Sequence, residues 1–150
     1  MKLKTLIICS LLLFLNTAKA QYAVNLGYGY FKTNAFYLGG DVNFNDNKEV
    51  IATNLGIGVF VATLDNKTVV LPEIHFNTTI PKIYFLMPNL SLTTKNVMPS
   101  LGLNLLNGIH IKAGYSKSFD KKLLDNGFYF GINLFLGDKD FYTKFKTFGI

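Results

Sequence analysis

The chain has 150 residues, about the length of one domain, and 49% of them are hydrophobic, 15% aromatic and only 16% charged. An ordinary soluble domain has about 25% charged residues, so this composition disfavours an ordinarily charged surface in water. All 15 basic residues are lysine and the formal net charge is +6, a balance that by itself points to an acidic partner.

Residues 1–20 have the features of a secretory signal peptide. Lys2 and Lys4 give a positively charged start, residues 6–15 form an apolar run, and residues 18–20, Ala-Lys-Ala, form a small-residue cleavage site. A helical membrane anchor needs about 20 apolar residues, about twice the length of this run. We therefore expect export followed by cleavage of residues 1–20.

Removal of this leader changes the charge and cysteine counts. The only cysteine, Cys9, follows Ile7 and Ile8 instead of the small residue that a lipoprotein site needs, so we expect no lipid attachment. Without the three leader lysines, 12 lysines face 9 acidic residues, a net charge of +3. We therefore expect no nucleic-acid partner, and a mature secreted chain without cysteine is no disulfide scaffold.

From Tyr22 onward, apolar side chains recur at every second residue, with Val24 and Leu26 continuing the same face. Because successive side chains of a strand point to opposite faces, this alternation predicts β-strands. No stretch has helical spacing, so the predicted class is all-β. Asn107-Gly108 is a strong hairpin signal between two of the segments. The predicted strands cover residues 22–31, 36–45, 51–62, 68–78, 82–94, 101–105, 109–116 and 127–137.

The strand count depends on two of the alternating segments. Residues 82–94 are interrupted by Pro88, which cannot donate a ladder hydrogen bond. Residues 138–150 also alternate, with Phe141 and Phe145 on one side. Either residues 82–94 form a strand and residues 138–150 a C-terminal tail, or residues 138–150 form the closing strand. We assign residues 21–137 to the β-domain.

Two all-β architectures compete for this pattern. In a secreted soluble barrel or sandwich that binds a small apolar ligand inside, the face opposite the bulky apolar residues meets water and should be rich in charge. Here that face is mostly Gly, Asn, Ala and Tyr, and its charged residues are Asp41, Glu73 and Lys112. A membrane barrel inverts the arrangement, with apolar residues toward lipid and small or polar residues inside.

Length favours a small antiparallel up-and-down transmembrane β-barrel of about eight strands. Spanning strands need about 9–11 residues each, and side chains fill the interior of a barrel of about eight strands, which excludes a wide pore. A closed sheet also pairs every backbone polar group, as lipid requires. Tyr22, Tyr30, Tyr84 and Tyr115 lie near predicted strand ends, where they would form aromatic girdles.

The aromatic-rich segment 127–136, the Lys- and Asn-rich composition, the stretch 96–107 and Gly114-Tyr115-Ser116 carry a resemblance. With the leader and the alternating segments, they make the chain resemble small eight-stranded outer-membrane β-barrels of Gram-negative bacteria, and in particular uncharacterised outer-membrane-type proteins of Bacteroidota. The resemblance implies a monomer in the cell outer membrane, surrounded by lipid, with a structural or surface-interaction role. Such barrels often end on an aromatic residue, whereas this chain ends on Ile150.

Five ionisable residues are predicted on inward faces: Asp41, Glu73, His75, His110 and Lys112. Because an unpaired charge inside a barrel is costly, we interpret them as a buried polar network that fills the lumen. The alternative is an acid–base pair completed by a serine nucleophile at position 116 or 118, which no nucleophile-elbow sequence supports. We therefore expect no enzyme activity and no cofactor.

Two further stretches are candidate contact sites. Residues 41–46 resemble the start of a calcium loop, but Asp46 and Ala52 stand where the loop needs Gly and Glu, so we interpret them as a polar turn and expect no metal. In the connection 119–126, Lys121 and Lys122 could contact lipopolysaccharide phosphates or another surface molecule, although such a pair is more often a solvated loop.

Overall fold

The computed structural model describes residues 21–43, 53–64, 67–80, 83, 85–105, 108–119 and 126–137, and these residues form eight β-strands. The strands are β1 Gln21–Tyr30, β2 Asn34–Asn43, β3 Thr53–Leu64, β4 Lys67–Thr78, β5 Leu86–Thr93, β6 Asn96–Leu105, β7 Ile109–Ser118 and β8 Gly127–Gly137. The predicted all-β class with about eight strands is therefore confirmed.

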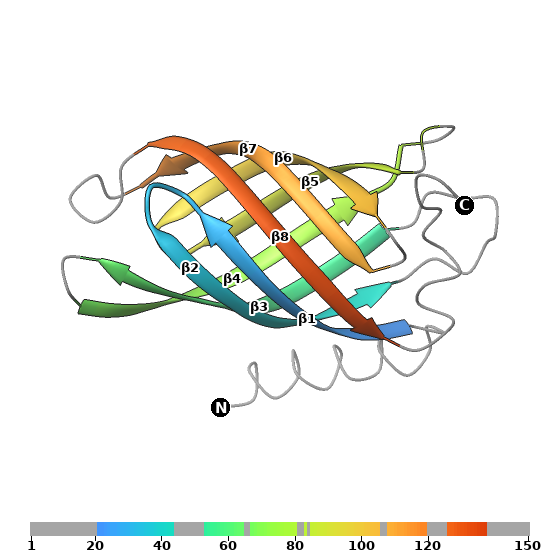
Figure 1. Cartoon of the computed structure of the whole chain (residues 1–150), viewed down its shortest axis with the longest axis horizontal. Helices are drawn as coiled ribbons and strands as arrows, with labels where there is room; N and C mark the ends of the chain where they lie inside the picture. Colours follow the sequence, from blue (N-terminus) through green and yellow to red (C-terminus); the bar gives the residue numbers. More distant parts are fainter. Residues whose placement is uncertain are drawn as a thin grey trace, which may run out of the picture.

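The strands form one closed antiparallel sheet in chain order (Figure 1). Each strand pairs with its neighbours in the sequence, and β1 pairs with β8 from Ala23 opposite Gly137 to Tyr30 opposite Phe130. Of the two closing segments that the sequence left open, β8 is the one that closes the barrel. Residues 138–150 lie outside the described residues.

The proline-containing segment is a strand of the wall. β5 pairs with both β4 and β6, and Pro88 lies beyond the β4–β5 ladder, which begins at Asn89, so no hydrogen bond of that ladder depends on Pro88. The predicted start of the sixth strand at residue 101 is wrong, because β6 begins at Asn96. Pro99 and Ser100 obscure the alternation in the sequence, although the inward and outward positions continue through them.

The barrel has two ends, which we name from the course of the strands. At the proximal end β1 begins with Gln21 and β8 finishes with Gly137. At the distal end β1, β3, β5 and β7 finish, and short connections of residues 31–33 and 94–95 lead from β1 to β2 and from β5 to β6. The distal end is at the left of Figure 1.

The two faces of the wall carry different side chains, as the alternation predicts. Outward residues are bulky and apolar, and many are largely exposed, with Phe36 at 72% and Ile57 at 66%. Inward residues are small, polar or aromatic. In the distal half, a buried cluster includes Phe31, Tyr37, Phe60, Leu71, Met98 and Tyr129. Because these side chains fill the lumen, the barrel is plugged at this level and not open.

Candidate functional site

An ion triad of Asp41, Glu73 and His75 occupies the middle of the lumen. Asp41 comes from β2 and the other two residues from β4, and all three side chains are at most 1% exposed. The His75 Nε2 lies 2.7 Å from Asp41 Oδ1, and His75 Nδ1 lies 2.9 Å from Glu73 Oε2. The structure thus brings together three of the five residues that the sequence predicted for the lumen.

The geometry of the triad indicates the charge state in which both of its hydrogen bonds can form. Both ring nitrogens of His75 face a carboxylate oxygen, and a carboxylate can only accept hydrogen bonds. Each contact is therefore made when both nitrogens carry hydrogen, which gives an imidazolium between two carboxylates. Charge-assisted bonds of this kind are stronger than neutral ones, and the positive ring offsets one of the two negative charges.

A glycine on β3 allows the triad to form across a strand. Gly56 stands opposite Asp41 on β2 and opposite His75 on β4. A Cβ at Gly56 would collide with the His75 ring and with Asp41 Oδ1. The absence of a side chain at this position therefore lets residues of two strands that are not neighbours bond directly over β3.

Further hydrogen bonds extend the triad around the barrel. Asn133 Nδ2 donates to Asn25 Oδ1 at 2.7 Å, and Asn25 Nδ2 donates to Asp41 Oδ2 at 2.8 Å. On the other side, Ser91 Oγ donates to Glu73 Oε1 at 2.5 Å. The bonded chain therefore links β8, β1, β2, β4 and β5, and it fixes the lumen side of these strands relative to one another.

Lys112 lies on β7 and completes the charge balance. Its side chain is buried and interacts electrostatically with Glu73 and with the Tyr129 hydroxyl. Among the described residues, the lumen thus contains two carboxylates, one imidazolium and one ammonium group. These four charges sum to zero, so the described part of the lumen attracts neither cations nor anions by net charge.

The fifth predicted residue, His110, lies apart from the triad. Its Nε2 contacts Met87 Sδ, and its ring packs edge-on against Phe135 with centroids 5.1 Å apart. Ser116, one of the two candidate nucleophiles, is not bonded to His75 or His110. Its Oγ instead accepts a hydrogen bond from Asn96 Nδ2. The nitrogens of His75 are engaged by carboxylates, so the geometry suits charge pairing better than proton transfer to a substrate.

A row of inward asparagines, Asn43, Asn54, Asn77 and Asn89, crosses the proximal half of the lumen. They stand opposite one another on β2, β3, β4 and β5, and all four are buried. Asn89 Nδ2 donates to Asn77 Oδ1. The sequence shows that such residues face inward, but it cannot show that they are neighbours, because that depends on the register of three strand pairs.

Among the described residues, no group of three or more His, Cys, Asp or Glu side chains is arranged so that it could hold a metal ion. In the calcium-like stretch, Asp41 is engaged by His75 and Asn25, and Asn45 and Asp46 lie outside the described residues. Lys121 and Lys122, the predicted external contacts, also lie outside them.

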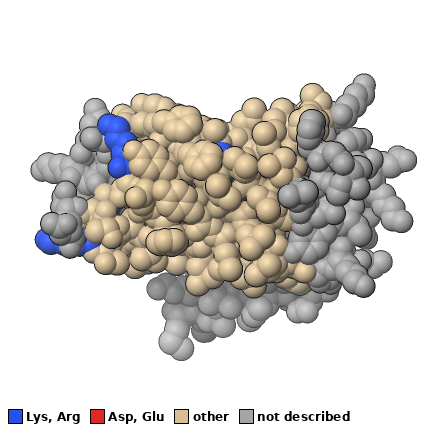
Figure 2. Space-filling model, in the orientation of Figure 1, with Lys and Arg blue, Asp and Glu red and all other residues tan. Residues whose placement is uncertain are grey.

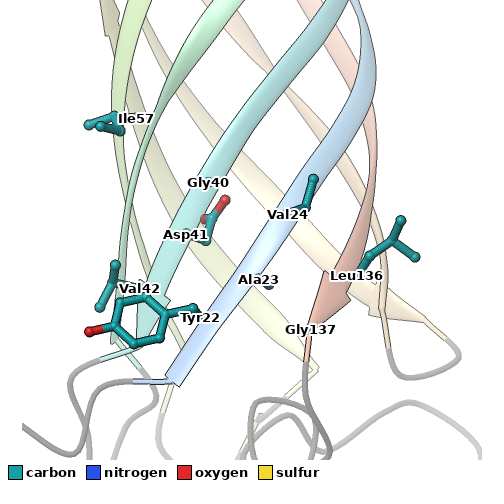
Figure 3. Close-up of a pocket in the computed structure, with 9 residues that line it drawn as sticks. All are labelled: Tyr22, Ala23, Val24, Gly40, Asp41, Val42, Ile57, Leu136 and Gly137. Carbon is teal, nitrogen blue, oxygen red and sulfur yellow. The ribbon is translucent and has the colours of Figure 1, made fainter.

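The outer face has a shallow groove of about 420 Å³ near the proximal end. Gly40 forms its floor, and Figure 3 shows Tyr22, Val24, Val42 and Ile57 around it. The Asp41 side chain points away from these residues, into the barrel (Figure 3). The groove therefore presents apolar groups outward, while the neighbouring carboxylate belongs to the lumen.

Comparison with known proteins adds no relative to these observations. The chain matches no family model, no curated protein and no solved structure. The part of the chain that the structure describes contains no helix that is long and apolar enough to cross a membrane.

Proposed function

We propose that this protein is an integral outer-membrane β-barrel with a structural or surface-interaction role, without a wide pore and without enzyme activity. One observation carries the proposal, namely the distribution of charge over the described residues. Asp41, Glu73 and Lys112 are buried in the lumen, and the four remaining charged residues all lie at the distal end. Between the two ends, the described outer face therefore carries no charge.

The apolar outer face supports this proposal physically. Large exposed hydrophobic residues surround the barrel on every strand, among them Leu26, Leu38, Ile57, Ile74, Leu90, Leu101, Ile132 and Leu134. Monomeric soluble proteins rarely expose contiguous apolar patches of more than a few hundred Å², whereas lipid-facing walls of membrane barrels consist of such residues. A closed sheet also has no edge strand, so it satisfies its backbone without a partner and favours a monomer.

The filled lumen limits what the barrel can do. The distal cluster and the ion triad occupy the interior, as in other small barrels whose side chains fill the inside. A soluble barrel that binds an apolar ligand would instead need an apolar cavity. We infer that any recognition takes place on the outer surfaces and not through the lumen.

Membrane fractionation tests the proposal. The full chain with its leader is expressed in a Gram-negative host, and the outer-membrane, inner-membrane and periplasmic fractions are separated. We expect the protein in the outer-membrane fraction, with a gel mobility that changes on boiling because the closed barrel resists detergent when unheated. Recovery in the soluble periplasm without a heat-dependent mobility shift would support the soluble ligand-binding barrel instead.

A further inference from the structure

Four lysines gather at the distal end of the barrel. Lys32 lies in the β1–β2 turn, Lys67 begins β4, Lys95 lies in the β5–β6 turn and Lys117 lies near the end of β7. We call these residues the distal lysine rim. Every other charged residue that the structure describes is buried in the lumen. Figure 2 shows most of the visible lysine atoms at the left end of the molecule and no acidic atoms on the visible face.

Exposed aromatic side chains lie next to the rim. Tyr30, Phe36, Tyr115, Phe119 and Phe128 are between 41% and 72% exposed. Phe119 directly follows β7, and the other four belong to the distal parts of β1, β2, β7 and β8, which adjoin one another across the closing β1–β8 pair; Tyr115 stands opposite Phe128. Aromatic rings favour the boundary between the acyl chains and the headgroups. Lysine extends its apolar stem along such a surface and places its ammonium group at the headgroups.

Lys32 shows how a lysine of the rim lies on the barrel. Its φ is 66°, in the left-handed region, where residues with a Cβ are disfavoured and Gly or Asn is preferred. Its stem lies against Gly127 at the start of β8, where an added Cβ would be 2.9 Å from Lys32 Cε. The apolar stem therefore follows the neighbouring strand, as expected for a lysine that carries its ammonium group to the end of an apolar surface.

We propose that the distal lysine rim binds the phosphate groups of anionic lipid headgroups, and so anchors this end of the barrel in the headgroup layer of one leaflet. The proposal rests on the membrane location proposed above. Each lysine close to an anionic membrane surface contributes about fivefold to the binding constant, and four of them spread around the rim contact several lipids at once. Salt screens exposed charges that are farther apart than a Debye length, about 10 Å at 0.1 M, so higher salt should weaken the attraction between the rim and the lipids.

Native mass spectrometry of the intact detergent-solubilised barrel tests this proposal. The mature chain is mixed with phosphatidylglycerol or with phosphatidylcholine of the same acyl chains, and lipid retention is compared. For the wild type we expect at least tenfold stronger retention of phosphatidylglycerol. In the variant with Lys32, Lys67, Lys95 and Lys117 all changed to Gln, retention of the two lipids should become equal within about twofold.

The matched control changes the same four lysines to Arg, which keeps the charge, and should retain the wild-type preference. An equal preference in the Gln variant and the wild type overturns the proposal, as does loss of the preference in the Arg variant. Displacement of phosphatidylglycerol by millimolar inorganic phosphate, but not by chloride at equal ionic strength, would instead indicate a free-phosphate site and also overturns it.

Two measurements distinguish a failure of lipid binding by the distal lysine rim from a failure of the proposed membrane location. In the first, the wild type, the Gln variant and the Arg variant are mixed with phosphatidylcholine vesicles, and insertion is followed by the heat-dependent mobility shift. This measures membrane insertion without anionic lipid, and failure to insert would contradict the proposed function. The single variant Lys32→Asn separates charge from fold. It should raise the unfolding midpoint, because Asn tolerates a positive φ, and should still reduce phosphatidylglycerol retention severalfold.

Discussion

The outer and inner faces of the wall alternate residue by residue along the same strands, yet they follow opposite rules. On β2, Leu38 is 55% exposed and its neighbour Tyr37 is buried. The outer face is apolar and needs no specific partner, since lipid chains and leucine are about equally apolar. The inner face combines the distal aromatic cluster with polar groups, and each of its charged groups interacts with a group of opposite charge. The specific side-chain contacts that fix one register between the strands are therefore made mainly in the lumen.

Removal of the cation from the triad is the strongest way to break the inner face. His75→Leu leaves Asp41 and Glu73 buried without the ring that bridges them. Loss of one partner from a buried ion pair typically costs about 3–5 kcal/mol, so we expect a comparable fall in the free energy of unfolding. Urea unfolding of the barrel in lipid vesicles measures it.

The double variant His75→Leu with Asp41→Asn is the control for this prediction. It leaves Glu73 and Lys112 as one negative and one positive charge, so the lumen is again neutral. The double variant should therefore be more stable than His75→Leu alone. If the two variants have the same unfolding free energy, the triad does not act as a charge pair.

A charge on the outer face tests the opposite rule. Leu38 lies in the middle of β2 and points outward. Leu38→Lys should lower the free energy of unfolding in a bilayer by about 2–4 kcal/mol, the cost of a lysine at the bilayer midplane. Phe119→Lys, at the distal end, should cost only about 0–1 kcal/mol. If Leu38→Lys stays within about 0.5 kcal/mol of the wild type, as for a solvent-exposed position, the outer face does not contact lipid.

These two faces also differ in how far the sequence could predict them. Period-two alternation predicted seven of the strand regions outright, left residues 82–94 open, and predicted the inward direction of residues such as Asp41 and His75, because side-chain direction is a local property of a strand. Local alternation misplaced the start of β5, which was predicted at residue 82 and lies at Leu86, and the start of β6, which Pro99 and Ser100 hid. Side-chain direction is almost enough to describe the outer face, because its apolar residues need no specific partner.

The contacts of the inner face were beyond the sequence. That Asp41 meets His75 over Gly56, whereas His110 contacts Met87 instead, depends on the register between strands that are far apart in the chain. A shift of one residue would turn each side chain to the other face. The sequence also predicted Lys112 only as a lumen charge, and its interaction with Glu73 on β4 depends on how the fold places β7 and β4.

Loss of the Lys112 charge should weaken the barrel less than loss of His75. In Lys112→Met, Glu73 and the Tyr129 hydroxyl both lose a nearby positive charge. A buried group left without its partner costs about 1–3 kcal/mol, and the methionine side chain keeps most of the packing. An unchanged urea midpoint in vesicles would show that Lys112 contributes nothing to the pairing of the inner face.

The smallest change that compares the two faces adds one methyl group to each. Gly56 and Gly40 lie on neighbouring strands, with Gly56 toward the lumen and Gly40 toward the outside. Gly56→Ala would push against His75 and Asp41. Overpacking of this kind costs about 1–3 kcal/mol, and the displaced ring should also lose its bond to Asp41. Unfolding in vesicles measures the cost, and the ¹⁵N chemical shifts of His75 report the bond.

Gly40→Ala is the matched variant on the outer face. A Cβ at this position meets only the Ala23 carbonyl oxygen, at an ordinary contact distance of 3.8 Å. Since alanine restricts the unfolded chain more than glycine does, the variant should gain about 0.4–1 kcal/mol of stability. Opposite signs for the two substitutions would show that the inner face is closely packed and the outer face is not. Equal losses at both positions would mean that the groove over Gly40 is occupied as tightly as the lumen.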